Sequence, residues 1–245
     1  MMTNPFALDG RTALVTGANT GLGQGIAVAL AQAGADIVAA GRRAPLETQA
    51  AIEALGRRFH FIAADLASTS PIAGMVEETL GKMGRLDILV NNAGTISRAD
   101  ALDVTEADWD RVIDVDLKAA FFLAQAAARH MAVSGGGKII NVASMLSFQG
   151  GIRVPAYTAA KSGLAGITKA LANEWAKARI NVNAIAPGYF ATDITHSLRE
   201  DEIRSREIMA RIPAGRWGVP ADLGGAAVFL AAAASDYVQI GRAHV

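Results

Sequence analysis

The sequence predicts an α/β protein built on a single doubly wound parallel sheet. Short aliphatic and β-branched runs alternate with longer segments of helical periodicity along the whole chain, and continuous apolar strands of this kind are typical of a sheet that helices cover on both faces. The chain has 245 residues, of which 51% are hydrophobic and 19% charged, and this is enough for one large core. We therefore expect one domain over residues 1–245, with ligands bound beyond the carboxyl ends of its strands.

The expected elements follow one another in a regular order. The run RTALV predicts a first strand at 11–15, and a glycine turn then leads into a helix that Gly34 can end. The polar stretch at about 195–217 interrupts the rhythm and predicts a helical insertion over the active site. Further strands are expected at 35–40, 59–65, 85–94, 138–144 and 180–188, with helices up to about Leu55, from Trp109 to Met131 and from Tyr157 to Ala178.

Composition excludes several classes of function. Lys and Arg total 23, as do Asp and Glu, so no net charge attracts a nucleic acid or an anionic membrane. The chain has no cysteine, which excludes disulfides, thiolate catalysis and cysteine-ligated metals, and its four histidines lack the spacing of metal ligands. The segment MMTNPFALDGR lacks the features of a signal peptide. We expect a soluble, cytoplasmic protein without a metal, a membrane or a nucleic-acid partner.

The stretch TGANTGLG at 16–23 follows the first expected strand and opens the first helix. Its glycines at 17, 21 and 23 allow the backbone to approach a pyrophosphate closely, and a helix N-terminus offers free N–H groups and the positive end of the helix dipole. The spacing predicts a dinucleotide site. The alternative is a tight turn in which the glycines serve only packing.

Further motifs lie after the later strands: NNAG at 91–94, Ser144, Tyr157 with Lys161, and PGYFAT at 187–192. Together with the TGxxxGxG loop, they resemble the short-chain dehydrogenase/reductase family over nearly the whole sequence. The resemblance implies a Rossmann-like fold, a nicotinamide cofactor, a small-molecule substrate and a homo-oligomer, usually a tetramer.

The same resemblance implies individual roles in cofactor binding. Asp65 is expected to hold the adenine ring, Asn91 to lie beside the cofactor ribose, and Thr192 to contact the nicotinamide carboxamide. The alternatives are a helix N-cap for Asp65 and a turn for the Asn91–Asn92 pair. The full set of expected cofactor contacts is Gly17, Asn19, Gly21, Leu22, Gly23, Arg42, Asp65, Leu66, Asn91, Ala93, Gly94, Tyr157, Lys161, Pro187, Gly188 and Thr192.

The end of the second expected strand bears on the choice of cofactor. An acidic residue at this place accepts the ribose hydroxyls of NAD, whereas a nearby cation accommodates the 2′-phosphate of NADP. The chain has Gly41 at this place, followed by Arg42 and Arg43, and a guanidinium suits a phosphate dianion. We predict NAD(P) with a preference for NADP; the alternative is a solvated basic turn.

Ser144, Tyr157 and Lys161 are the predicted catalytic residues. Tyr157 and Lys161 are four residues apart, so both point the same way on a helix. A nearby ammonium makes a phenol more acidic, and Tyr157 can then act as general acid in reduction and general base in oxidation. Ser144 can stabilise the oxygen on which negative charge develops. This set suits the interconversion of a ketone and a secondary alcohol.

Asp116 departs from the family pattern. In VIDVDLKAAFF it stands where the family usually has an asparagine whose backbone carbonyl holds a water in the proton path from the lysine. An aspartate can preserve that carbonyl, but its charge can also pair with Lys161 and weaken the effect of the ammonium on Tyr157. We count Asp116 among the candidate catalytic residues.

The loop FQGGIRVPA, between Ser144 and Tyr157, is expected to border the substrate. It offers Gln149 and Arg153, which with Ser144 are the predicted substrate contacts. Three further cations, Arg98, Arg211 and Arg216, can also face the site. Such cations indicate an acidic, hydroxyl-rich substrate such as a sugar acid, unless they pair with surface carboxylates instead.

Three long segments narrow the resemblance. SMLSFQGGIRVPAYTAAKSG, NEWAKARINVNAIAPGY and RIPAGRWG resemble a branch of the family that acts on 2-keto-3-deoxygluconate at carbon 5. NAD is the cofactor usually attributed to that branch, in conflict with the prediction from Arg42. The alternatives are an enzyme acting on gluconate at carbon 5, a 3-oxoacyl carrier-protein reductase, and a weakly catalytic cofactor-binding module.

The segment SDYVQIGRAHV also departs from the family. Related sequences continue after SDYV with a glycine, a last strand and a VDGG turn, whereas QIGRAHV offers no strand of useful length and no VDGG. We therefore expect the last strand of the sheet to be missing or replaced, which leaves the usual tetramer contacts in doubt.

Overall fold

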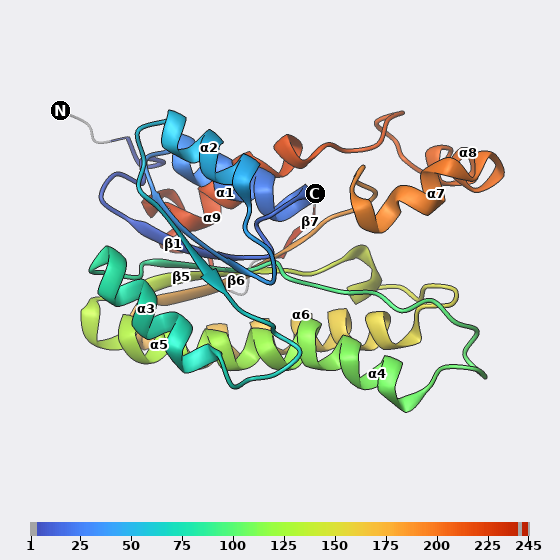
Figure 1. Ribbon diagram of the computed structural model, residues 1–245, viewed down its shortest axis with the longest axis horizontal. Coiled ribbons are helices and arrows are strands. Elements are labelled where there is room, and N and C mark those ends of the chain that lie inside the picture. The colour runs from blue at the N-terminus through green and yellow to red at the C-terminus, as the bar shows by residue number, and fades with distance from the viewer. Residues whose placement is uncertain (1–3, 240–241, 245) are drawn as a thin grey trace.

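The computed structural model describes residues 4–239 and 242–244. Its centre is a parallel sheet with the strand order β3-β2-β1-β4-β5-β6-β7 (Figure 1). The order reverses between β1 and β4, which confirms the predicted doubly wound fold class. The strands are β1 Thr12–Thr16, β2 Asp36–Gly41, β3 Phe59–Ala63, β4 Ile88–Asn91, β5 Gly137–Val142, β6 Ile180–Ala186 and β7 Arg242–His244.

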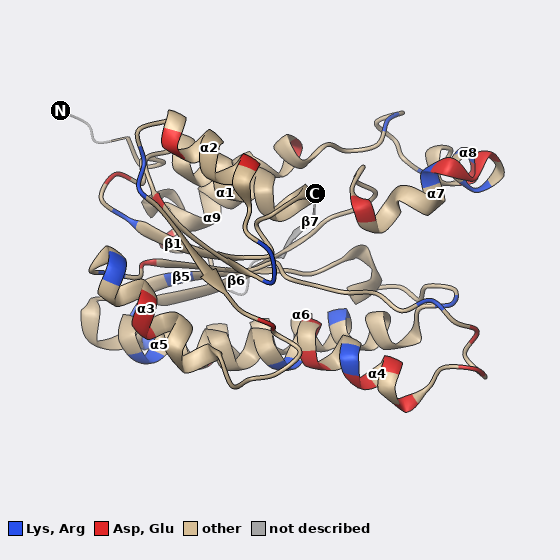
Figure 2. Cartoon of the chain, viewed as in Figure 1, with Lys and Arg blue, Asp and Glu red and all other residues tan. Residues whose placement is uncertain are grey.

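Helices cover both faces of this sheet (Figure 1). One face carries α1, α2 and α9, and the other carries α3, α5 and α6, with α4 leading into α5. Charged residues of both signs lie mainly on the helices and loops (Figure 2). The helices are α1 Gly21–Gln32, α2 Leu46–Ala54, α3 Ile72–Met83, α4 Glu106–Ile113, α5 Ala119–Ser134, α6 Pro155–Trp175, α7 His196–Glu200, α8 Glu202–Met209 and α9 Gly224–Ala231.

The side chains of successive strand residues pack alternately into two separate apolar cores, one on each face of the sheet. Val15 and Ile37 pack into the core below α1 and α9, whereas Leu14 and Val38, one residue away on the same strands, pack into the core below α3 and α5. This alternation follows from the two-residue period of a strand. It explains why both faces of the strands are apolar in the sequence. In the described part of the chain, no helix is long and apolar enough to cross a membrane.

The expected helix from Trp109 to Met131 is present but contains a π-helical turn. It begins earlier, at Glu106, where Thr105 Oγ1 accepts a hydrogen bond from the Asp108 N–H at 3.1 Å. A π-helical turn at Asp114–Lys118 then separates α4 from α5. Such turns insert an extra residue into a helix and are frequent at functional sites. Here the turn contains Asp116.

The polar insertion forms α7 and α8, which lie beyond the carboxyl edge of the sheet (Figure 1). At the far edge of the sheet, the usual last strand is replaced by the short β7, which pairs in parallel with Ala184–Ala186 of β6. The sequence offered little sign of this strand because it is only three residues long. Residues 240, 241 and 245 of the same terminal segment lie outside the described residues.

Asp87 holds β1 and β4 together at the amino edge of the sheet. Its Oδ1 accepts hydrogen bonds from Arg11 at 2.9 Å and Arg85 at 2.6 Å, and its Oδ2 accepts one from the Thr12 N–H at 2.9 Å. Burial alone would raise the pKa of Asp87, but these hydrogen bonds outweigh burial and hold the pKa below its ordinary value of 3.8. The carboxylate is therefore the form that the fold stabilises.

We expect Asp87→Asn to lower the free energy of unfolding at pH 7 by about 1–2 kcal/mol, because hydrogen bonds to a charged group are lost. A carboxyl group with a lowered folded-state pKa adds stability above its unfolded value and loses it as the pH falls through the folded value. The gap between wild type and variant should thus persist from pH 7 to about pH 4 and close below it. Urea unfolding followed by tryptophan fluorescence measures the gap, and one that persists in acid would contradict this role.

Candidate active site

A cleft of about 470 Å³ opens at the carboxyl edge of the sheet, beside the point where the strand order reverses. Turns after β1, β2, β3, β4, β5 and β6 all contribute to its lining, as do the π-helical turn and the start of α6. Most of the predicted site residues line it together: Gly17, Asn19, Gly21, Leu22, Gly23, Arg42, Asp65, Leu66, Ala93, Gly94, Asp116, Ser144, Tyr157, Lys161, Pro187, Gly188 and Thr192.

The glycine loop after β1 is shaped as a close-packed turn. Gly17 and Gly21 have positive φ angles of 65° and 58°, which residues other than glycine rarely adopt. A Cβ on Gly23 would overlap the Gly17 carbonyl oxygen and the Asn92 amide. The loop therefore brings its backbone onto the start of α1, where free N–H groups can receive an anion.

The two asparagines of NNAG have different positions. Asn92 Nδ2 donates to the carbonyl oxygens of Thr16 at 2.9 Å and Gly17 at 3.1 Å, which braces the glycine loop. Asn91 is buried and lies outside the lining of the cleft. Its Nδ2 donates to Ala120 O at 3.1 Å and to Asn141 Oδ1 at 2.9 Å. Asn91 thus ties β4 to α5 and β5, and its contact with a cofactor ribose remains a prediction.

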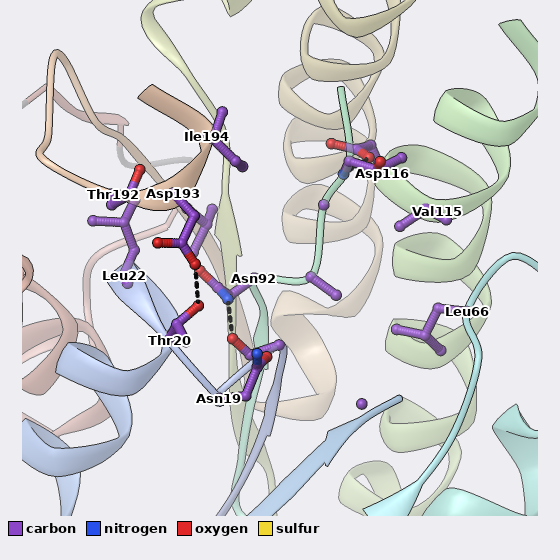
Figure 3. Close-up of a pocket in the computed structure, with 18 of the residues that line it drawn as sticks. Asn19, Thr20, Leu22, Leu66, Asn92, Val115, Asp116, Thr192, Asp193 and Ile194 are labelled. Carbon is purple, nitrogen blue, oxygen red and sulfur yellow. Dashed lines mark hydrogen bonds between the residues drawn. The ribbon is translucent and has the colours of Figure 1, made fainter. Parts of the chain in front are cut away.

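Two free cations lie at one end of the cleft. Arg42 and Arg43 are exposed, line the cleft after β2, and have no ion pair or hydrogen bond within the described part of the chain. Nearby, Asp65 is exposed and its Oδ1 accepts a hydrogen bond from the Ala67 N–H at 3.0 Å. Leu66 and Val115 lie on the same wall of the cleft (Figure 3). An apolar wall beside free guanidinium groups suits a ligand in which a flat nucleobase lies next to a phosphate group.

The segment 192–195 closes another side of the cleft and is tied at two places. Thr20 Oγ1, in the glycine loop, donates to Asp193 Oδ2 at 3.2 Å (Figure 3). Arg98, after β4, donates from Nη2 to the carbonyl oxygen of Ile194 at 2.9 Å. These contacts hold the start of the α7–α8 insertion against the cleft.

Ser144 and Tyr157 face the cleft from two elements. Ser144 follows β5 and is buried, and its Oγ accepts a hydrogen bond from the Leu146 N–H at 3.1 Å. With this acceptor bond made, the hydroxyl proton can be donated to a ligand. Tyr157 lies in the first turn of α6 and is half-buried. The arrangement can hold a substrate oxygen between two hydroxyl groups.

Lys161 lies one helical turn after Tyr157, and its Nζ is 5.5 Å from the centre of the tyrosine ring. The Nζ donates to Val142 O at 3.0 Å and lies 3.3 Å from Asp116 Oδ2. Asp116 Oδ1 accepts a hydrogen bond from the Thr95 N–H at 2.7 Å. The structure therefore contains the ion pair between Asp116 and Lys161 that the sequence left open.

Burial affects the two members of this pair differently. Burial raises the pKa of Asp116 above its ordinary value, although Lys161 and the Thr95 N–H act in the opposite direction. Burial alone would lower the pKa of Lys161, but Asp116 and Tyr157 outweigh it and raise the pKa overall. The ammonium form of Lys161 is thus maintained inside the protein.

The sequence profile of the short chain dehydrogenase family matches residues 11–203. The chain belongs to the short chain dehydrogenase family. Among curated relatives, it is similar to the 2-dehydro-3-deoxy-D-gluconate 5-dehydrogenase of Escherichia coli, at 58% identity over 98% of this chain and 95% of that protein. It is also similar to the enzyme of the same name from Bacillus subtilis, at 55% identity over 96% of this chain and 92% of that protein.

A solved structure extends this similarity to the fold. It is described as a 2-deoxy-D-gluconate 3-dehydrogenase from Agrobacterium tumefaciens with bound NADP. It is 56% identical to this chain, with a TM-score of 0.93 over 99% of this chain and 97% of that one. The similarity covers the sheet, the cleft and the insertion, because it extends over nearly all of both chains.

The expected substrate residues of this short chain dehydrogenase do not gather at the catalytic trio. Gln149 is exposed and lies outside the lining, as does Arg153. Arg153 has a positive φ of 64°, and its Nε lies 3.1 Å from Asp100 Oδ1. Arg216 pairs with Asp222 at 2.6 Å, and Arg211 lies outside the lining. Arg153 and Arg216 are thus held by nearby carboxylates, the alternative that the sequence left open.

Sequence reasoning missed several residues that line the cleft, notably Thr20, Arg111, Val115 and Asp193. Arg111 and Val115 are four apart and so share a face of the helical segment that leads to Asp116. Val115 directly precedes Asp116, and helical spacing counted back from Val115 leads to Arg111. Asp193 directly follows the predicted Thr192, but only the fold brings it to Thr20.

We expect Tyr157→Phe to bind the nicotinamide cofactor as the wild type does and to lose turnover by at least about 100-fold, because general acid–base catalysis contributes that much or more. Cofactor fluorescence titration and steady-state rates measure the two effects. Tyr237→Phe is the matched control, since Tyr237 is fully exposed and lies outside the cleft. Full turnover by Tyr157→Phe would exclude Tyr157 as the proton-transferring group.

Proposed function

We propose that the chain is a nicotinamide-dependent oxidoreductase that interconverts a ketone and a secondary alcohol on a small sugar acid, 2-keto-3-deoxygluconate at carbon 5. The observation that carries this proposal is the meeting of Ser144, Tyr157 and Lys161 with a glycine loop at one cleft. The similarity to dehydrogenases of that name over nearly the full chain supports the choice of substrate.

The residues of the cleft fit a dinucleotide. The glycine loop has no room for side chains at Gly23, and it leads into the N-terminus of α1, which suits a pyrophosphate. Leu66 and Val115 would contact the adenine ring, with Asp65 beside it. Thr192, with Pro187 and Gly188, would hold the nicotinamide, as the family resemblance implies. When bound, the cofactor supplies or accepts the hydride at the substrate carbon.

The chain's own groups then handle the oxygen and its proton. In reduction, the Ser144 hydroxyl donates a hydrogen bond to the carbonyl oxygen, and Tyr157 transfers its proton to that oxygen as the carbon receives the hydride. In oxidation, the phenolate of Tyr157 removes the proton from the alcohol. Lys161, held by Val142 O and Asp116, is the cation that faces the tyrosine ring.

The preference for NADPH rests on the free guanidinium groups after β2. Arg42 and Arg43 line the cleft without carboxylate partners in the described residues, so either can pair with a 2′-phosphate. The relative from Agrobacterium tumefaciens was crystallised with NADP, which supports the same choice.

We expect a lower KM for NADPH than for NADH, and we expect Arg42→Ala to raise the KM for NADPH by about 10-fold or more, the value of one charge-assisted hydrogen bond. NADH lacks the 2′-phosphate and is the internal control, so its KM should stay within about two-fold. Steady-state kinetics with both cofactors measure the effect. A preference for NADH that survives Arg42→Ala would contradict the assignment.

An acidic substrate is supported by Arg98. Its guanidinium makes one hydrogen bond, to the carbonyl of Ile194, which itself lines the cleft. Arg98 lies outside the lining of the cleft, but no carboxylate pairs with it in the described part of the chain, so its charge is available to a substrate carboxylate at the edge of the cleft. We propose that Ser144, Gln149 and Arg153 complete the substrate contacts, which for the two loop residues requires the loop to close.

The substrate assignment is tested with three substrates and both cofactors. We expect kcat/KM for 2-keto-3-deoxygluconate, and for reduction of its 5-keto form, to exceed the values for gluconate and for an acyl β-ketone by at least about 10-fold, the selectivity that one well-placed contact provides. Higher activity with gluconate or the acyl β-ketone would replace the assignment by that of the corresponding enzyme. Tight cofactor binding without any turnover would indicate a cofactor-binding module.

We also propose that residues 1–245 act as one NAD(P)-binding domain, with 195–217 as a lid over the site. The family resemblance supports a homo-oligomer, usually a tetramer, and a cytoplasmic location fits the use of a nicotinamide cofactor. No nucleic acid, membrane or metal takes part in this proposal.

A further inference from the structure

The pair formed by Asp116 and Lys161 is almost completely removed from solvent. The exposed fractions of the two side chains are 0% and 4%. Asp116 Oδ2 is buried and has no hydrogen-bond partner with favourable geometry in the described residues, so its main neighbour is the Lys161 ammonium at 3.3 Å. With little water to screen it, the carboxylate acts directly on that ammonium.

The backbone fixes this contact from two sides. The π-helical turn Asp114–Lys118 presents Asp116 to the cleft, where its Oδ1 is held by the Thr95 N–H at 2.7 Å. Gly94 packs so closely that a Cβ there would lie 2.8 Å from Asp116 Oδ2. The Thr95 N–H and the close backbone of Gly94 therefore hold the carboxylate beside Lys161.

The position of the carboxylate opposes the effect of the lysine on the tyrosine. An ammonium near Tyr157 stabilises a phenolate, and a carboxylate beside that ammonium offsets its charge. Asp116 Oδ2 is nearer to Nζ, at 3.3 Å, than is the centre of the tyrosine ring, at 5.5 Å. An asparagine at this position would have a similar shape without the offsetting charge.

We propose that Asp116 is a positioning residue that adapts the site to ketone reduction at neutral pH, because its charge keeps the proton on Tyr157 that reduction requires. Alcohol oxidation, which needs the phenolate, then requires a more alkaline solution. This proposal rests on the proposed function. Arg42 and Arg43 do not bear on the direction, because the 2′-phosphate that they suit is present in both NADPH and NADP⁺.

The balance of the step shows why protonation decides the direction. In reduction, the carbonyl carbon gains a hydride and its oxygen gains the proton of Tyr157, which leaves an alcohol, the oxidised nicotinamide and a phenolate. The phenolate then regains a proton from solvent. In oxidation, the phenolate takes the hydroxyl proton as the hydride leaves the carbon. Whatever stabilises the protonated phenol therefore extends reduction to higher pH and delays oxidation.

Other charged groups face the same cleft and have to stay constant in a test. On the π-helical turn, Asp114 pairs with Lys118 at 3.0 Å, while Val142 and Thr95 contribute only backbone groups to the pair. Asp114 and Lys118 lie outside the lining. Besides Asp116 and Lys161, the charged or titratable side chains that line the cleft are Arg42, Arg43, Asp65, Arg111, Tyr157 and Asp193. Substitution of Asp116 leaves all of them in place.

The test compares pH profiles of kcat/KM in both directions for wild type, Asp116→Asn and Asp114→Asn. In Asp116→Asn, we expect the pH of half-maximal oxidation to fall by about one to three units, the shift that one nearby charge produces. The alkaline decline of reduction should move by the same amount. Asp114→Asn, on the same turn but paired at the surface, should follow the wild type. A variant Asp116→Asn that is slower by one factor at every pH would overturn the proposal.

A spectroscopic titration tests the same point without substrate or turnover. The chain has three tyrosines, so the difference in phenolate absorbance between wild type and Tyr157→Phe, both with NADP⁺ bound, isolates Tyr157. We expect little phenolate at neutral pH in the wild type, and its complete formation there would overturn the proposal even if Asp116→Asn fails to fold. If no sugar acid turns over, the same titration of Asp116→Asn against the wild type, in the presence and absence of NADP⁺, still decides the role of Asp116, so failure of the proposed function is separately visible.

Discussion

The hydrogen bonds between Thr16 and Asn92 are the constraint on which the site depends. Thr16 ends β1, and its Oγ1 accepts hydrogen bonds from the N–H groups of Asn92 and Ala93, each at 3.0 Å. In return, Asn92 Nδ2 donates to the carbonyl oxygens of Thr16 and Gly17. These bonds join β1 and β4 where the strand order reverses, so the glycine loop is placed relative to the catalytic half of the sheet. A cofactor held by one half can therefore reach the side chains of the other half.

Much of the fold could be predicted from the sequence because its signals are local. Strands such as β1 and β6 are buried along their whole length and are mostly apolar, since helices cover both of their faces. The glycine spacing reflects contacts within a few residues, such as that of Gly23 with Gly17. The π-helical turn between α4 and α5 could not be predicted, because such a turn has no strong sequence pattern. Similarly, the last strand of the sheet was expected to be missing or replaced, but the position of the three-residue β7 was not predicted, because so short a strand has no visible periodicity.

Some residues of the candidate site could be predicted from the sequence and others could not. Ser144, Tyr157 and Lys161 meet because their spacing along a strand end and one helix turn fixes their direction. The positions of the arginine side chains could not be predicted in this way, because a long side chain can reach several different carboxylates. Arg153 lies beside Asp100, and Arg216 beside Asp222, and both partners lie outside the cleft lining. Sequence can place a short side chain on a known element, but it gives the pairing of an exposed arginine only when the tertiary contacts are known.

The charges of the cleft are divided between its two ends, and this division separates binding from chemistry. At one end, Arg42 and Arg43 are free and the N-terminus of α1 adds a positive partial charge, so a multiply charged anion gains binding energy there. At the other end, the buried ammonium of Lys161 is already met by Asp116, so little net charge faces the reacting oxygen. An uncompensated cation at this end would stabilise bound anions and phenolate alike. Because Asp116 offsets the charge of Lys161, a bound anion gains its binding energy mainly at the end of the cleft that holds the two free arginines.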